Sequence, residues 1–181
     1  MSDTLKPYTM ITDYLTGREI PNIGAEENRQ AVVQFLVEAK GYSKDDITAD
    51  VNIEIMVAGK LYRSQVDLVV TAGHAKKRIM VFKCAAGSLG SREREIVAAA
   101  RLLDNYQIPL AVVSDGKTAI VLDTNAGKKI GEGMDAIPAK DAVIKNLDSY
   151  RFAAFPSERL EREKLIFRTY DSENVNVQRN L

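Results

Sequence analysis

The sequence predicts an α/β (α+β) fold with a mixed central β-sheet flanked by helices. Three observations predict this class. Apolar residues repeat at the helical period over 24–41, they alternate with polar residues in two segments joined by a tight turn, and short apolar strands alternate with a helical segment from residue 79 onward. Since strands and helices are mixed along the chain, we expect the helices to cover the faces of one sheet.

The first predicted helix follows Gly24 and stops at Gly41. Glu26 and Arg29 extend its apolar face toward the N-terminus. Residues 1–23 contain two prolines and show no clear period. We therefore treat them as a lead-in segment.

Two alternating segments, 46–57 and 61–70, follow this helix, and the turn at residues 58–60 predicts a β-hairpin. The later predicted elements are strands at 79–83, 110–114 and 118–124, the last two joined by a turn at Asp115-Gly116, and helices over about 92–106, 139–149 and 158–168. We expect the last dozen residues to be loose. The predicted organisation is a lead-in over 1–23, a core over 24–133, and a C-terminal helical extension with a loose tail over 134–181.

Composition limits the kinds of site that the chain can build. A length of 181 residues with 45% hydrophobic and 28% charged residues suits one globular domain. A single cysteine and a single histidine, Cys84 and His74, exclude an internal disulfide and leave carboxylate oxygens as the main metal ligands. The sequence has no apolar stretch long enough for a membrane span and no signal-peptide pattern, so we expect a cytoplasmic protein without membrane contact.

The net charge of zero hides an uneven distribution of charge. Residues 60–101 carry nine basic and three acidic side chains, whereas residues 1–59 carry five basic and ten acidic ones. A cationic segment of this kind is typical of proteins that contact the phosphate backbone of nucleic acids. We expect DNA to bind through the basic residues Arg63, Lys76, Lys77, Arg78, Arg92 and Arg94.

Carboxylates and one lysine mark points where predicted elements begin or end. Glu26 and Glu27 open the first helix, Asp67 ends the apolar half of the second strand, and Lys83 ends the strand at 79–83. A metal-dependent nuclease needs hard oxygen ligands for Mg²⁺ and a cation or base near the attacking water. Because strand ends converge at one edge of a sheet, we expect these groups to meet there.

Several stretches of the chain follow one another in a recognisable order. They are Glu26-Glu27-Asn28-Arg29-Gln30, Gly41-Tyr42, Arg63 with Asp67-Leu68-Val69-Val70, Lys83, the segment from Ile108 to Gly116, Leu122-Asp123-Thr124, and Gly127-Lys128. This order resembles the N-terminal domain of type I restriction enzyme R subunits, which belongs to the PD-(D/E)xK nuclease superfamily. The resemblance covers about residues 24–133 and implies a restriction-endonuclease-like fold.

The resemblance also implies roles for individual residues. Asp67 would be the metal-binding aspartate, and Lys83 would be the lysine of the (D/E)xK motif, which stabilises charge or orients water. Glu26 or Glu27 would be the helix carboxylate that supports the metal site. Tyr106 would match the aromatic residue of the Gln-xxx-Tyr pair that such domains often carry.

Two positions depart from the family pattern. Val81 stands two residues before Lys83, where the family has an acidic metal ligand, and Leu102 stands at the glutamine position. One interpretation is that the acid has migrated, and the candidates for it are Glu93, Glu95 and Glu54. The other is a degenerate domain that binds no Mg²⁺.

The leading functional hypothesis is a stand-alone restriction-endonuclease-like domain that binds DNA and hydrolyses phosphodiester bonds with Mg²⁺. The first rival is a catalytically inactive nuclease-fold module that binds nucleic acid or protein. A third hypothesis is a regulatory protein that forms a homo-oligomer through its charged C-terminal helix.

Overall fold

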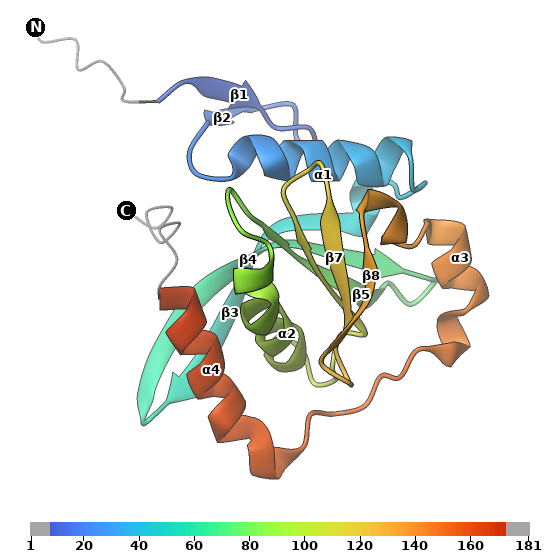
Figure 1. The fold of residues 1–181 in the computed structure, drawn as a ribbon. Helices are drawn as coiled ribbons and strands as arrows, with labels where there is room; N and C mark the ends of the chain where they lie inside the picture. The colour runs from blue at the N-terminus through green and yellow to red at the C-terminus, as the bar shows by residue number, and fades with distance from the viewer. Residues whose placement is uncertain (1–7, 173–181) are drawn as a thin grey trace, which may run out of the picture.

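A computed structural model describes residues 8–172, and in this part of the chain six strands form one mixed sheet flanked by helices (Figure 1). This confirms the predicted α+β class. The strands lie in the order β3-β4-β5-β6-β7-β8, and only β5 and β6 are parallel. They are β3 (Ile47–Val57), β4 (Lys60–Ala72), β5 (Lys77–Cys84), β6 (Leu110–Ser114), β7 (Ala119–Asp123) and β8 (Lys128–Glu132). The α-helices are α1 (Glu26–Glu38), α2 (Glu93–Leu102), α3 (Lys140–Lys145) and α4 (Leu160–Ser172).

The connections between strands explain the mixed topology. Strands β3 and β4 form the predicted hairpin, and its two turn residues, Ala58 and Gly59, have φ angles of 49° and 76°. Positive φ at both central residues matches the twist of the flanking strands. Strand β6 runs parallel to β5 because α2 lies between them in sequence and carries the chain back to the other end of the sheet.

The two faces of the sheet carry separate apolar clusters. Helices α1 and α3 cover one face, where Leu36 and Val143 pack with Phe82 of β5. Helices α2 and α4 cover the other face, where Ala99 of α2 and Phe167 of α4 belong to the same cluster as strand residues such as Val69, Val81 and Ala111. This two-sided cover explains why the central strands read as continuous apolar runs.

Strand β4 extends further than the sequence predicted, and Asp67 lies inside it. The strand has 13 residues, so the expected position of Asp67 at a strand end is wrong. Leu68 and Val70 belong to the α1-side cluster, whereas Tyr62 and Val66 belong to the α2-side cluster. Val69 also belongs to the α2-side cluster, so both faces of the strand are buried from Val66 to Val70.

Three features of the structure differ from the sequence-based prediction. Helix α2 ends at Leu102 rather than near residue 106, because the polar pair Asp104-Asn105 favours a turn over helix. Strand β8 was not predicted, since Gly127 and Gly131 obscured an exposed edge strand. The lead-in also contains a small antiparallel pair, β1 (Met10–Thr12) and β2 (Glu19–Pro21).

The C-terminal part of the chain is more extensively packed than its charged sequence suggested. Helix α3 is shorter than predicted and is followed by a 3₁₀ turn at Leu147–Ser149, whereas α4 continues to Ser172. The rest of the predicted loose tail lies outside the described residues. Within residues 8–172, no helix combines the length and the apolar character that crossing a bilayer requires.

Candidate active site

Asp67 and Lys83 lie opposite each other on neighbouring strands. Leu68 of β4 pairs with Phe82 of β5, so the antiparallel register places Asp67 across from Lys83. Phe82 and Cys84 belong to the α1-side cluster, so the alternation of the strand turns Lys83 toward α2. Asp67 and Lys83 are only 4% and 6% exposed. The register of β4 against β5 therefore brings these two residues next to each other.

The Asp67 carboxylate is held in place by the backbone of β5. Its Oδ2 accepts a hydrogen bond from the backbone N–H of Cys84 at 2.7 Å. A charge-assisted bond of this length fixes the orientation of the carboxylate. Asp67 is thus tied to the strand that carries Lys83.

Glu95 of α2 completes this arrangement. Its Oε1 lies 3.2 Å from the Nζ of Lys83, and Glu95 is 3% exposed. Its other oxygen, Oε2, lies 3.6 Å from a guanidinium nitrogen of Arg92, which is half-buried at the start of α2. The first turn of α2 therefore places a carboxylate beside the lysine and an arginine beside that carboxylate.

The other two candidates for a migrated acid lie elsewhere. Glu54 of β3 is exposed and pairs with Arg63 of β4 at 2.8 Å. Glu93 opens α2 and is half-buried, but it is Glu95 that makes the ion pair with Lys83. Among the three candidates, Glu95 is the one that pairs with Lys83, and its role as a migrated acid stays a prediction.

The position of Val81 explains why an acid on β5 would be unfavourable. Val81 is fully buried in the α2-side cluster, together with Val69 of β4 and the alanines of α2. A carboxylate in such surroundings would be separated from water and from polar partners, which costs several kcal/mol. A carboxylate delivered from the helix avoids this cost, because Glu95 meets Lys83 near the end of β5.

The carboxylates around Lys83 keep its side chain protonated. Burial alone would lower the pKa of Lys83, but the Asp67 and Glu95 carboxylates together raise this pKa above its ordinary value. Lys83 is therefore an ammonium group at neutral pH, and it can stabilise negative charge rather than accept a proton.

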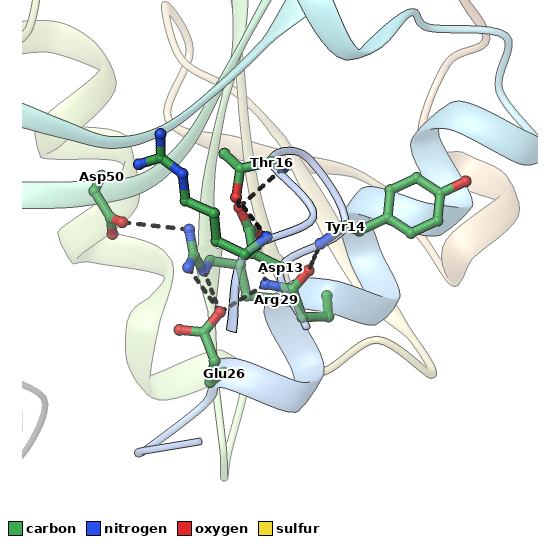
Figure 2. A network of polar contacts seen from close by, with 8 residues as sticks. Asp13, Tyr14, Thr16, Glu26, Arg29 and Asp50 are labelled. Atoms are coloured by element: carbon green, nitrogen blue, oxygen red, sulfur yellow. Dashed lines mark hydrogen bonds and ion pairs between the residues drawn. The ribbon is translucent and has the colours of Figure 1, made fainter. Parts of the chain in front are cut away.

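Glu26 belongs to a different polar network, which Figure 2 shows. Its Oε1 accepts hydrogen bonds at 2.8 Å from Nε of Arg29 and from the side-chain amide of Gln30. Arg29 also reaches Asp50 of β3 at 3.4 Å, and Gln30 donates to Asp13. Both Glu26 and Arg29 are buried.

The network around Glu26 ties α1 to the hairpin. Ala49 pairs with Leu68 and Val51 with Val66, so Asp50 lies across from Asp67. Glu27, the other predicted helix carboxylate, is exposed and accepts a hydrogen bond from Asn22 at 2.6 Å. The structure thus brings Glu26 to Arg29 and Gln30, and the role of either glutamate in a metal site stays a prediction.

Helix α4 contributes a hydrogen bond and an electrostatic effect on Lys83 that sequence reasoning missed. The hydroxyl of Tyr62 on β4 donates a short hydrogen bond to Oδ2 of Asp171 on α4. Burial, this bond and the charge of Asp171 all raise the pKa of Tyr62, and the Asp171 carboxylate also adds to the field that keeps Lys83 charged. The helical pattern of 158–168 predicted the helix, but no local signal linked it to β4.

The predicted cationic surface divides into two groups. Lys76–Arg78 lie where β5 begins, whereas Arg92 and Arg94 follow its end, and a strand of eight residues separates the groups by roughly 25 Å. In the first group Lys76 pairs with Asp46 at 2.6 Å and Lys77 lies over the ring of Phe152.

Arg78 and Tyr106 also belong to the first group. Arg78 lies 3.5 Å from Asp104, and its backbone N–H donates to the hydroxyl of Tyr106 at 2.9 Å. Tyr106 therefore packs at the beginning of β5, whereas Lys83 stands near the end of that strand.

Comparison with known families matches this chain over its sheet and its first two helices. A family model described as the N-terminus of the type I restriction enzyme R protein covers residues 24–138, which is more than half of the chain. The chain belongs to this family. The resemblance seen in the sequence is therefore confirmed, while searches among curated proteins and solved structures returned no match.

The type I restriction R-protein region contains Asp67, Lys83 and Glu95, but it ends before α4. Among residues 8–172, no group of three or more His, Cys, Asp or Glu side chains is placed to hold a metal ion. Two carboxylates stand at Lys83, and Mg²⁺ is commonly bound by one or two carboxylates together with phosphate oxygens of the substrate. Asp67 and Glu95 are therefore of the residue type that Mg²⁺ takes as ligand, and the ion would need further oxygen ligands from outside the described side chains.

Proposed function

We propose that this chain is a DNA endonuclease that hydrolyses phosphodiester bonds with Mg²⁺, and that its acidic ligand has moved from β5 to α2. The observation that carries the proposal is the contact of 3.2 Å between Lys83 and Glu95, with Asp67 across from the same lysine. An aspartate, a glutamate and a lysine are the three residue types that the family resemblance requires. The migrated-acid interpretation accounts for Val81 without loss of a carboxylate.

Each residue has a distinct task in this proposal. Asp67 and Glu95 would hold Mg²⁺, which when bound lowers the pKa of water and offsets charge on a phosphate. Lys83, as an ammonium, stabilises the negative charge that grows on the phosphate oxygens as water attacks phosphorus. The backbone N–H of Cys84 keeps the Asp67 carboxylate oriented.

DNA would approach from the start of α2. Arg92 is half-buried beside Glu95, and Arg94 is exposed on the same turn. Both side chains stand close in sequence to Glu95, so they suit contacts with phosphates that flank the scissile bond. The membership in a restriction-enzyme family supports DNA as the partner.

Cleavage of supercoiled plasmid with Mg²⁺ or Mn²⁺ tests the proposal. We expect Asp67→Asn, Glu95→Gln and Lys83→Met each to lower the cleavage rate by at least about 100-fold, because each removes charge that acts on the reacting phosphate. Glu93→Gln is the matched control, since it removes a carboxylate from the same helical turn, and it should change the rate by less than about threefold. Equal rates for wild type and Glu95→Gln would reject Glu95 as the migrated acid.

The burial of the three residues favours one alternative, an inactive accessory module. Asp67, Lys83 and Glu95 have little exposure, and with Arg92 beside Glu95 their charges balance, as they would in a structural ion-pair cluster. This alternative predicts DNA or protein binding without cleavage, together with a loss of thermal stability in all three variants. The same plasmid assay, combined with melting curves, distinguishes the two functions.

A further inference from the structure

Helix α4 runs along the buried site although it lies outside the family region. It packs beside α2 (Figure 1), and Phe167 and Asp171 are buried on its inner side. The family model ends at residue 138, so α4 lies outside the matched region, which contains Asp67, Lys83 and Glu95. A phosphodiester cannot reach three residues that are less than 7% exposed unless some covering element moves.

The two ends of α4 are attached differently. Near its start, Glu163 forms a buried ion pair with Arg101 of α2 at 2.9 Å, and Arg101 also donates to the carbonyl of Thr124. Near its end, Asp171 accepts the hydrogen bond from Tyr62. The start is held by a buried pair of full charges, which is costly to separate, whereas the hydrogen bond described near the end joins a neutral donor to a carboxylate.

The negative charge of Asp171 indicates which kind of group could take its place near Lys83. The charge of Asp171 acts on Lys83 in the same direction as the charges of Asp67 and Glu95, and unlike those two residues Asp171 lies outside the family region. A DNA phosphate carries the same sign of charge as a carboxylate. A phosphate that entered the site could therefore compensate Lys83 in place of Asp171.

We propose that the last turn of α4 is a removable cover over the Lys83 site, latched by the hydrogen bond from Tyr62 to Asp171, and that a DNA phosphate displaces Asp171 when the cover opens. The placement of the cover follows from helix packing: Glu163 near the start of α4 pairs with Arg101 near the end of α2, so the helices run antiparallel and the last turn of α4 lies beside the first turn of α2, which carries Glu95 (Figure 1). The identity of the displacing group rests on the proposed function.

Opening is measured by the reactivity of Lys83 toward an acylating reagent, followed residue by residue with mass spectrometry of the full chain. Tyr62→Phe removes the hydrogen bond to Asp171 and keeps the aromatic ring, whose centroid lies 6.3 Å from that of Phe167. We expect acylation of Lys83 to rise at least about fivefold in this variant, while acylation of exposed Lys60 stays the same. Tyr14→Phe removes an exposed tyrosine–carboxylate bond of the same kind, to Glu38, and should leave Lys83 protected.

Hydrogen exchange of the backbone amides of α4 gives a second measure of opening. Tyr62→Phe should speed exchange over the last turn of the helix and leave the turn around Glu163 protected. Unchanged acylation and unchanged exchange in Tyr62→Phe would overturn the cover, whether or not the protein cleaves DNA. Opening in a protein that cleaves no DNA would keep the cover and reject the nuclease function.

Displacement by phosphate is tested with a short DNA duplex in the presence of Ca²⁺. We expect the duplex to speed exchange in the last turn of α4 in the wild-type protein. Asp171→Asn keeps an acceptor for Tyr62 but removes the competing charge, so DNA should bind about three- to tenfold more tightly. Slower exchange in α4 on DNA binding, or unchanged or weaker binding by Asp171→Asn, would contradict displacement.

Discussion

At the scale of single residues, the structure depends on carboxylates that are buried with their partners. Asp67 and Glu95 share Lys83, and Glu26 binds Arg29. Asp46 is held by two lysines, Lys76 at 2.6 Å and Lys140 at 2.7 Å. Removing one member of such a group leaves a buried charge uncompensated, which costs more than the pair itself contributes.

Asp46 gives a stability prediction with a defined pH dependence. Burial would raise the pKa of Asp46, but hydrogen bonds from Lys140, Lys76 and Ser43 lower it well below its ordinary value. A carboxyl group whose pKa is lowered by folding stabilises the protein above its unfolded-state pKa, and this contribution is lost as the pH falls below about 4. We expect Asp46→Asn to lower the free energy of unfolding at pH 7 by about 1–3 kcal/mol.

Urea unfolding at pH 7 and at pH 3 measures this effect. The difference between wild type and Asp46→Asn should shrink at the lower pH, where wild type has lost part of the contribution of its carboxylate. Asp45→Asn is the neighbouring control, because Asp45 is exposed and its substitution should change little at either pH. A difference of the same size at both pH values would mean that Asp46 acts through its shape rather than its charge.

At the scale of elements, the site depends on how α1 packs against the turn between β6 and β7. Gly116 in that turn has a φ of 83°, and a Cβ atom there would lie 2.8 Å from the Cβ of Ala31 in α1 and 3.2 Å from the carbonyl oxygen of Asn28. Asn28 in turn donates to the carbonyl of Ala85, just after β5, at 2.6 Å. The turn therefore sets the distance between α1 and the strand that carries Lys83.

Gly116→Ala should cost more stability than a glycine substitution in an open turn. We expect a loss of about 2–4 kcal/mol, which combines the strain of a positive φ with a steric clash against α1. Gly59→Ala has a similar φ of 76° but open space around it, so about 1 kcal/mol is expected. Thermal or urea unfolding of both variants compares the two costs, and equal losses would show that α1 adapts without strain.

At the scale of the whole molecule, charge is distributed so that part of the cationic segment is already neutralised within the fold. Lys76 and Arg63 are paired with carboxylates, whereas Arg94 is exposed at the start of α2. The basic residues of 60–101 therefore do not form one surface. DNA binding should depend most on the group next to Glu95.

The salt dependence of DNA affinity tests this division. For about six phosphate contacts, affinity should fall roughly a thousandfold between 50 and 200 mM salt. Arg94→Gln should reduce the slope of log affinity against log salt by about one, whereas Lys76→Gln should leave it unchanged because Lys76 is paired with Asp46. Fluorescence anisotropy with a labelled duplex measures both slopes, and a larger effect of Lys76→Gln would place the DNA at the other end of β5.

The sequence by itself determined the class of fold, most of the strands, the family and the pair Asp67 and Lys83. These follow from local periodicity and from the order of motifs, which a single chain displays directly. It also narrowed the migrated acid to three glutamates, because residue type restricts what can bind a hard cation.

Only the tertiary structure decided which of these glutamates meets Lys83, and only it revealed Asp171 and Tyr62. These contacts depend on the register of β4 against β5 and on the packing of α2 and α4 over one face, which join residues up to 109 positions apart. Local sequence patterns carry no information on contacts between residues so far apart in the chain. The free energy that stabilises these contacts comes from burying two separate helices on the same sheet. Strand β8 and the β1–β2 pair were not predicted for another reason. They are short and exposed, so their sequences show little alternation of apolar and polar residues.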